Sequence, residues 1–100
     1  MLDHLQFDAR ALEAFCRRWS VTRLSLFGSA LREDFGPDSD VDVLVDFEPG
    51  APVSLWDWGP MIEELRTIFG RQVDLVETAG LTNPLRRRHI LAHTHQLYAA

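Results

Sequence analysis

The sequence predicts an α+β fold, with a small β-sheet that has helices packed on one face and acidic side chains on the other. Residues 21–27 and 41–47 are short apolar runs of the kind that form buried strands. Around them, apolar side chains recur at the spacing of amphipathic helices. One hundred residues suffice for one modest hydrophobic core, so we expect a single domain over residues 1–100.

The first helix is expected to begin near Asp8 and to precede the strand at 21–27. Its apolar side chains follow the i, i+3, i+4, i+7 spacing of one helical face: Leu12, Phe15, Cys16 and Trp19. A sheet face must be covered by another element. This stripe therefore predicts a helix that packs on the sheet.

A second helix is predicted between residues 54 and 70, after the second strand and a Pro- and Gly-rich break. Ser54 with Asp57 three residues later resembles a capping box, and Gly70 suits the position after the last turn. A third strand is expected near 73–76, directly after this helix. The spacing thus predicts a helix between two strands.

The last helix is expected to start at Asn83-Pro84, a favourable N-cap and first-turn pair, and to run through Tyr98. The predicted order of elements is therefore α-β-(turn)-β-α-β-α. His89 and His93 on this helix have the i, i+4 spacing of metal ligands. They lack the intervening Glu of a zinc hydrolase, so we interpret them as a solvated helix face.

Composition excludes several classes of function. The net charge of −5 argues against direct, non-specific nucleic-acid binding, and no apolar run approaches the ~20 residues that span a membrane. All ten basic residues are Arg, so any phosphate recognition uses guanidinium groups, backbone amides or a metal. Cys16 is the single cysteine, which indicates a core thiol in a reducing cytoplasm.

Two polar motifs flank the first two strands. Gly28-Ser29 follows the first strand, and Ser39-Asp40-Val41-Asp42 opens the second. Because side chains alternate along a strand, Asp40 and Asp42 face the same way, about 7 Å apart at Cα. Two such carboxylates can share Mg²⁺, and a glycine lets a triphosphate approach the backbone. One motif would bind phosphate, and the other would bind the metal that bridges to it.

These residues resemble the signature of the minimal nucleotidyltransferase (MNT) family of the DNA polymerase β superfamily. Its pattern is approximately G-S-x-x-R followed by S-D-x-D, and here it becomes Gly28-Ser29-Ala30-Leu31-Arg32 and then Ser39-Asp40-Val41-Asp42. The resemblance covers nearly the whole chain. It implies the small mixed β-sheet nucleotidyltransferase core.

The resemblance also implies a third carboxylate on a later strand. Asp74, between apolar neighbours at 73–76, is the candidate, whereas Glu77 and Asp46 look like solvated strand-end residues. Asp74 would act as a general base or as a ligand of a second metal, and the sequence leaves these roles open. The implied site consists of catalytic Ser29, Asp40, Asp42 and Asp74, with Asp40, Asp42 and Asp74 as metal ligands, and nucleotide-binding Gly28, Ser29, Arg32 and Ser39.

The function implied is transfer of AMP from ATP to a hydroxyl of a partner protein, with Mg²⁺ or Mn²⁺ as cofactor. In the MNT family the partner would be a HEPN ribonuclease toxin, the acceptor one of its tyrosines, and this chain the antitoxin. A chain this short has no acceptor domain. The acceptor must therefore be held by a partner or by a second copy, as a hetero-oligomer or homodimer.

Two alternatives stay open at this point. The chain could be a non-catalytic antitoxin that masks its partner, or a nucleotidyltransferase for a small molecule. Intact acidic residues favour an enzyme over a masking protein, and the missing acceptor domain counts against a small-molecule substrate. The run Arg86-Arg87-Arg88 is either a solvated helix face or a docking surface for an acidic partner.

Overall fold

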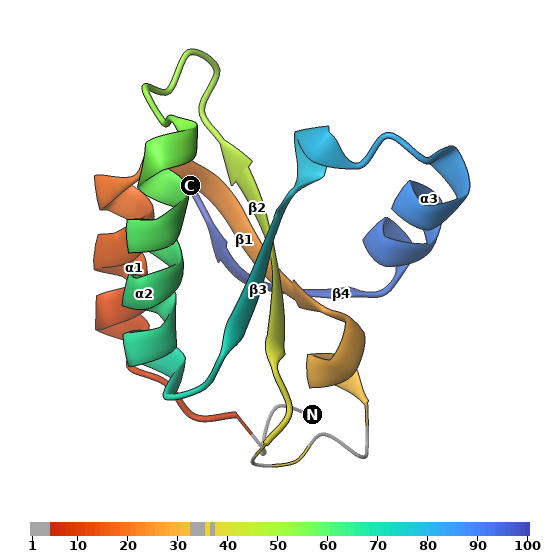
Figure 1. Cartoon of the computed structure of the whole chain (residues 1–100), viewed down its shortest axis with the longest axis horizontal. Helices are drawn as coiled ribbons and strands as arrows, with labels where there is room; N and C mark the ends of the chain where they lie inside the picture. The colour runs from red at the N-terminus through yellow and green to blue at the C-terminus, as the bar shows by residue number, and fades with distance from the viewer. Residues whose placement is uncertain (1–4, 33–35, 37) are drawn as a thin grey trace.

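The computed structural model describes residues 5–32, 36 and 38–100, and for residues 29 and 30 it describes the backbone only. Figure 1 shows the arrangement of the elements in this part of the chain. In chain order they are α1 (Ala9–Arg18), β1 (Val21–Phe27), the 3-10 helix η1 (Gly28–Leu31), β2 (Val41–Phe47), η2 (Leu55–Asp57), α2 (Trp58–Phe69), β3 (Val73–Glu77), η3 (Thr78–Gly80), α3 (Pro84–Ala92) and β4 (Thr94–Ala99).

The four strands form one mixed sheet in the order β3-β2-β1-β4. β1 pairs antiparallel with β2 and with β4, whereas β2 and β3 run parallel because α2 connects them. The connection through a helix is what parallel neighbours require. The predicted fold class, a small mixed α+β core, is confirmed.

The helices α1 and α2 lie side by side on one face of the sheet (Figure 1). The main core lies between them and the sheet, and its fully buried members include Phe15, Leu24, Val43, Met61 and Leu65. Along β2, Val41, Val43 and Val45 turn into this core. Their neighbours Asp42 and Leu44 turn to the other face, as the alternation of a strand demands.

Local signals place the helix ends where the sequence predicts them. The Asp8 carboxylate accepts hydrogen bonds from the amides of Arg10 and Ala11 at 2.9 and 3.4 Å, so it caps α1. Asn83 caps α3 in the same way. Gly70 ends α2 in the left-handed conformation, with φ of 68°.

The predicted last helix is wrong in its second half. α3 ends at Ala92, and residues 94–99 form β4, which pairs with the edge of β1. Without β4, β1 would expose a row of unpaired backbone groups. Burial of Leu97 and Tyr98 against the main core adds to this pairing, and together they outweigh the helical spacing of the segment.

The position of the last helix also differs from the expectation that all helices share one face. α3 lies across the sheet from α1 and α2 (Figure 1). Its buried Ile90 joins a second apolar cluster with Phe27, Leu44 and Leu81 on the face that carries Asp42. None of the helices described is long and apolar enough to span a membrane.

Candidate active site

Asp42 and Asp74 are neighbours across the parallel pair of strands. They are register partners in the ladder that joins β2 to β3, so both side chains leave the same face of the sheet. Adjacent strands lie about 4.8 Å apart, which sets the separation of their backbones. Asp42 is half-buried and Asp74 is exposed. Two acids that lie 32 residues apart in the chain therefore meet on one open surface.

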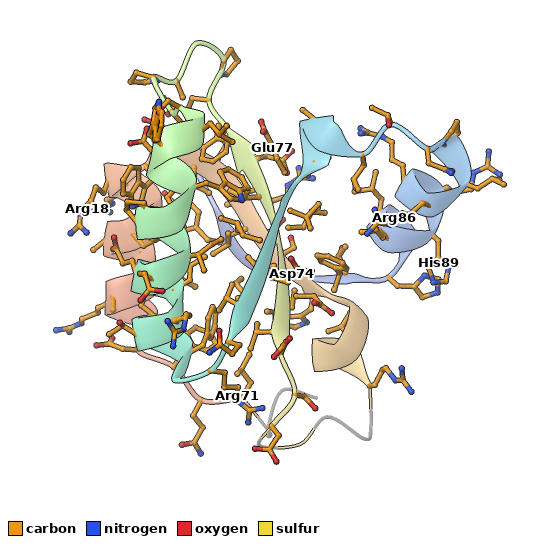
Figure 2. All side chains as sticks on the ribbon, viewed as in Figure 1. Arg18, Arg71, Asp74, Glu77, Arg86 and His89 are labelled. Carbon is orange, nitrogen blue, oxygen red and sulfur yellow. The ribbon has the colours of Figure 1, made fainter. Side chains whose placement is uncertain are left out.

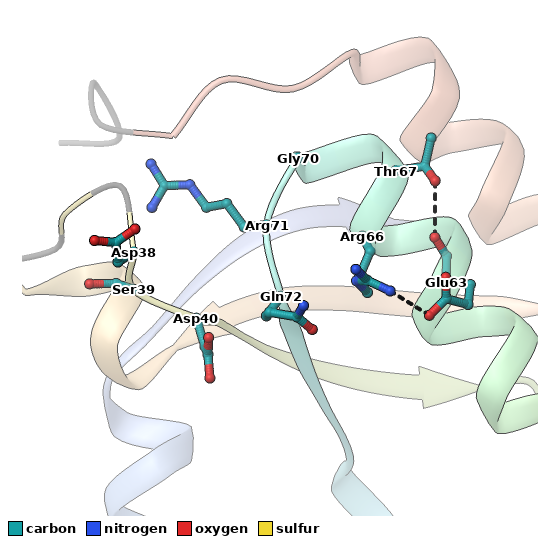
Figure 3. A pocket seen from close by; sticks show the side chains of 9 residues that line it. All are labelled: Asp38, Ser39, Asp40, Glu63, Arg66, Thr67, Gly70, Arg71 and Gln72. Atoms are coloured by element: carbon teal, nitrogen blue, oxygen red, sulfur yellow. Dashed lines mark hydrogen bonds and ion pairs between the residues drawn. The ribbon is translucent and has the colours of Figure 1, made fainter.

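Asp40 lies just before β2, at the end of a turn that begins at Gly36. The Gly36 amide donates to the Ser39 hydroxyl at 3.0 Å, and the Ser39 amide donates to the Gly36 carbonyl at 3.1 Å. The Arg71 guanidinium donates to the same carbonyl from the start of β3. Figure 3 shows Arg71 reaching toward this turn. The turn that presents Asp40 is thus held from the neighbouring strand.

Gly28 lies against Asp42, one acid of this pair, at the end of β1. Phe27, the residue before it, is the register partner of Asp42 in the antiparallel ladder. Gly28 has a φ of +63°, and a Cβ at this position would overlap the Asp42 carboxylate. The glycine therefore allows the Gly-Ser loop and the first acid of the sheet to approach each other.

The remaining nucleotide-binding candidates lie near this contact. The backbone of Ser29 belongs to η1, whereas its side chain lies outside the described part of the structure. Arg32 follows η1 and is exposed. Ser39 uses its hydroxyl within the turn that precedes β2. Glu77 lies away from Asp74, in a hollow lined by Phe47 and Trp58 beside α2.

Two hollows flank the acids. One, of about 440 Å³, lies beside the end of α2 and is bordered by Ser39, Asp40 and Arg71 (Figure 3). The other, of about 550 Å³, lies between η1 and α3 and is bordered by Gly28 and Arg32. The two motifs of the sequence therefore each border a hollow, and Asp42, which lines neither, lies next to Gly28.

The three consecutive arginines of α3 have three different surroundings. Arg86 lines the hollow next to Gly28, whereas Arg87 donates to the carbonyl of Thr78 at 2.9 Å. Arg88 is exposed. Figure 2 shows Arg86 and His89 across the sheet from Arg18 of α1. All three are exposed, and a docking surface for an acidic partner stays a prediction.

A family model for the nucleotidyltransferase domain matches residues 9–96, which include the three α-helices, the strands β1 to β3 and the first half of β4. The chain belongs to the nucleotidyltransferase family. It is 39% identical to the protein adenylyltransferase MntA of Thermococcus cleftensis over 70 residues, which are 70% of this chain and 69% of the relative.

Solved structures agree with this membership. A structure described as a "putative minimal nucleotidyltransferase" superposes with a TM-score of 0.69 and 34% identity, over 86% of this chain and 85% of the other. A toxin–antitoxin crystal structure with AMP-PNP has a TM-score of 0.72 at 17% identity, over 93% and 74% of the two chains. At that identity, the second likeness concerns the fold alone.

The acidic residues of this nucleotidyltransferase suit a hard divalent ion by their chemistry. Among the residues described, no three His, Cys, Asp or Glu side chains are already gathered closely enough to hold a metal. Mg²⁺, however, is usually bound by one or two carboxylates together with substrate phosphates. The register pair Asp42 and Asp74 supplies two such carboxylates on one face, so the residues fit a site that the nucleotide completes.

One contributor, Arg71, escaped the sequence analysis. It acts on the turn through a backbone carbonyl, an interaction that leaves no signature in the chain. Arg86 and His89, which the sequence pointed to as a docking residue and as part of a solvated helix face, border the hollow beside Gly28. With Ile90 and His93 they follow the i, i+3, i+4, i+7 pattern of one helical face.

Proposed function

We propose that the chain transfers AMP from ATP to a tyrosine hydroxyl of a partner toxin of the HEPN type, and thereby acts as its antitoxin. The observation that carries this proposal is the pairing of Asp42 with Asp74 beside Gly28. It brings two acids of the sheet to the loop expected to bind phosphate.

The comparisons support the acceptor and the nucleotide. The Thermococcus cleftensis relative bears the name protein adenylyltransferase, and the solved toxin–antitoxin structure contains AMP-PNP. The acidic pair lies on an exposed surface with no further domain over it in the described residues. An open site suits a protein substrate, because the partner itself can exclude water when it docks. A cytoplasmic location suits ATP as substrate and the lone, buried Cys16.

The reaction requires one bond to form and one to break at the α-phosphorus. The tyrosine oxygen bonds to that phosphorus, the bond to the β-phosphate oxygen breaks, and pyrophosphate leaves. Asp74, the more exposed acid of the pair, would either receive the tyrosine proton as a general base or hold a second metal ion. Gly28 and Ser29 hold the phosphates through backbone amides, with Arg32 beside them. Ser39 holds the turn that presents Asp40.

Asp40, Asp42 and Asp74 would hold Mg²⁺ or Mn²⁺ together with the triphosphate. The metal supplies charge neutralisation of the phosphates when it is bound. Without it, the three carboxylates and the triphosphate repel one another. Titration calorimetry with a non-hydrolysable ATP analogue should therefore show a large loss of affinity in EDTA. Equal affinities with and without EDTA would contradict a metal site at these acids.

The transfer itself is tested with the partner and Mg-ATP. We expect intact-mass spectrometry of the partner to show one or more added AMP groups with the wild-type chain and none with Asp42→Asn. The same variant should still form the complex, since the substitution keeps the shape of the side chain. A partner that is neutralised in cells by Asp42→Asn as well as by the wild type would instead identify a masking antitoxin.

A further inference from the structure

The hollow between η1 and α3 combines two arginines and two histidines with the apolar side chains of Phe27, Leu31 and Ile90. Gly28 and Arg32 border it on the η1 side, and Arg86, His89 and His93 border it on the α3 side. Of the described residues that line it, none is acidic. Its volume of about 550 Å³ is in the range of small-molecule sites. In a chain with a net charge of −5, two arginines around a hollow without acidic residues among its described lining favour an anion there.

The packing of α3 fixes which side chains reach this hollow. Ile90 is buried against Phe27 and Leu44, so the helical face that contains it is turned toward the sheet and η1. Arg86 and His93 lie four residues before and three residues after Ile90 in sequence, and they share that face. The His89 and His93 rings lie side by side, with centroids 4.7 Å apart.

His93 is further oriented by its own helix. Its Nδ1 lies 2.9 Å from the His89 carbonyl oxygen, a hydrogen bond in which the ring nitrogen donates. Arg86 has a different environment from its neighbour Arg87, whose guanidinium donates to the Thr78 carbonyl. The arginine that borders the hollow is therefore distinct from the arginine that anchors α3 to η3.

We infer that this hollow binds the β- and γ-phosphates of the nucleotide, with Arg86 and His89 as phosphate-binding residues supplied by α3. The inference rests on the proposed function and adds ligands to it. Gly28 lies against Asp42 and also borders the hollow. In this proposal, a triphosphate whose α-phosphate lies at the acidic pair extends past Gly28 toward Arg86.

Electrostatics favours this direction for the phosphate tail. The acids of the site repel phosphate, and the chain has no lysine to compensate for them. Guanidinium groups bind phosphate with two parallel, charge-assisted hydrogen bonds. Arg32 and Arg86 border the hollow from opposite walls, so a phosphate between them could contact both. The pyrophosphate leaving group would develop its negative charge in this same basic environment.

The test compares AMP, ADP and a non-hydrolysable ATP analogue in calorimetric titrations with Mg²⁺. We expect Arg86→Ala to weaken the ATP analogue by about tenfold, the effect of losing one charge-assisted hydrogen bond. The affinity for ADP should fall less, and the affinity for AMP should not change. Arg86→Lys should recover part of the affinity because it keeps the charge. His89→Gln should also weaken binding of the ATP analogue most and of AMP least, but by smaller factors.

The matched control is Arg10→Ala, which removes the same charge from an exposed position on α1, across the sheet. It should leave all three affinities unchanged. Equal losses for AMP and the ATP analogue in Arg86→Ala would overturn the inference, because the hollow would then hold the nucleoside. Unchanged affinities in Arg86→Ala would also overturn it.

Failure of this inference can be told apart from failure of the proposed function. If Arg86→Ala binds nucleotide normally while Asp42→Asn abolishes AMP transfer, the inference fails and the proposed function stands. If the wild-type chain binds no nucleotide in Mg²⁺, the proposed function fails and the inference fails with it. Circular dichroism of each variant verifies that an altered affinity does not arise from unfolding.

Discussion

Gly28 lies so close to Asp42 that a side chain at position 28 would force the Asp42 carboxylate to move. A Cβ on Gly28 would lie 3.2 Å from Cγ of Asp42 and would overlap its carboxylate oxygen. The backbone of Gly28 also has a φ of +63°, which L side chains rarely adopt. The Gly28-Ser29 loop can therefore approach Asp42 of β2 only because residue 28 has no side chain.

Replacing Gly28 with alanine should affect stability and the site together. The left-handed conformation alone costs a non-glycine residue roughly 1–2 kcal/mol, and the overlap with Asp42 adds to that cost. We expect Gly28→Ala to lower Tm by about 5–15 °C, at about 4–8 °C per kcal/mol for a chain of this size. AMP transfer should fall at least tenfold at temperatures where the variant remains folded.

Gly50→Ala is the control for this substitution. Gly50 also has a positive φ, of 78°, but a Cβ there would meet no atom within 4 Å. It should therefore destabilise through the backbone alone and leave AMP transfer intact. If both variants retain transfer, the contact between Gly28 and Asp42 has no part in the site.

Substitutions of Asp42 and Asp74 should reduce AMP transfer, whereas substitution of Asp46, the other acid of β2, should not. Asp42→Asn and Asp74→Asn should each reduce AMP transfer by more than a hundredfold. Each should leave Tm unchanged or slightly raised, because like charges directly opposite in a sheet repel. Asp46→Asn is the control, since Asp46 is four residues along β2, roughly 13 Å from Asp42. Normal transfer by either member of the pair would exclude it from the chemistry.

Arg71 should act on rate through the turn that presents Asp40. Arg71→Ala removes a hydrogen bond to the Gly36 carbonyl, so the turn can move relative to β3. We expect kcat for transfer to fall by about tenfold, or ~1.4 kcal/mol, with a smaller change in KM for ATP. Arg17→Ala is the control, because Arg17 pairs with Glu13 at 2.9 Å on the exposed surface of α1. Equal effects of the two variants would contradict a positioning role for Arg71.

Cys16 should make the fold sensitive to alkaline pH. Burial, with a smaller contribution from Glu13, raises the pKa of the Cys16 thiol to about 12, so the folded state keeps the proton. The unfolded thiol ionises near its ordinary pKa of about 8.5. The contribution of the thiol to stability is therefore complete below about pH 8.5 and is lost as pH rises toward 12.

Urea denaturation between pH 7 and 11 checks this dependence. Cys16→Ala should have a lower free energy of unfolding at pH 7, because it leaves a cavity in the core. Its free energy of unfolding should fall less than that of the wild type as pH rises. Thiol reagents at pH 8 should react with the native chain only as fast as it opens. Rapid reaction of the native protein would mean that Cys16 is accessible.

Local sequence signals determined most of the individual elements. β1 and β2 have the predicted limits because their apolar runs are short and are bounded by turn residues. The side chains of Asp8 and Asn83 cap the first turns of α1 and α3, and Gly70 ends α2 in the left-handed conformation. The Gly-Ser and Asp-x-Asp motifs were detectable for a similar reason, since each depends on residues adjacent in the chain.

The tertiary structure decided the features that depend on distant partners. Residues 94–99 form β4 because the edge of β1 is available to them, and no local pattern encodes an available edge. α3 lies on the face that carries Asp42 because Ile90 packs against Phe27 and Leu44 on that face. The pairing of Asp42 with Asp74 and the place of Arg86 beside Gly28 have the same origin. Contacts between residues far apart in the chain depend on how the elements pack, so they became visible only in the folded protein.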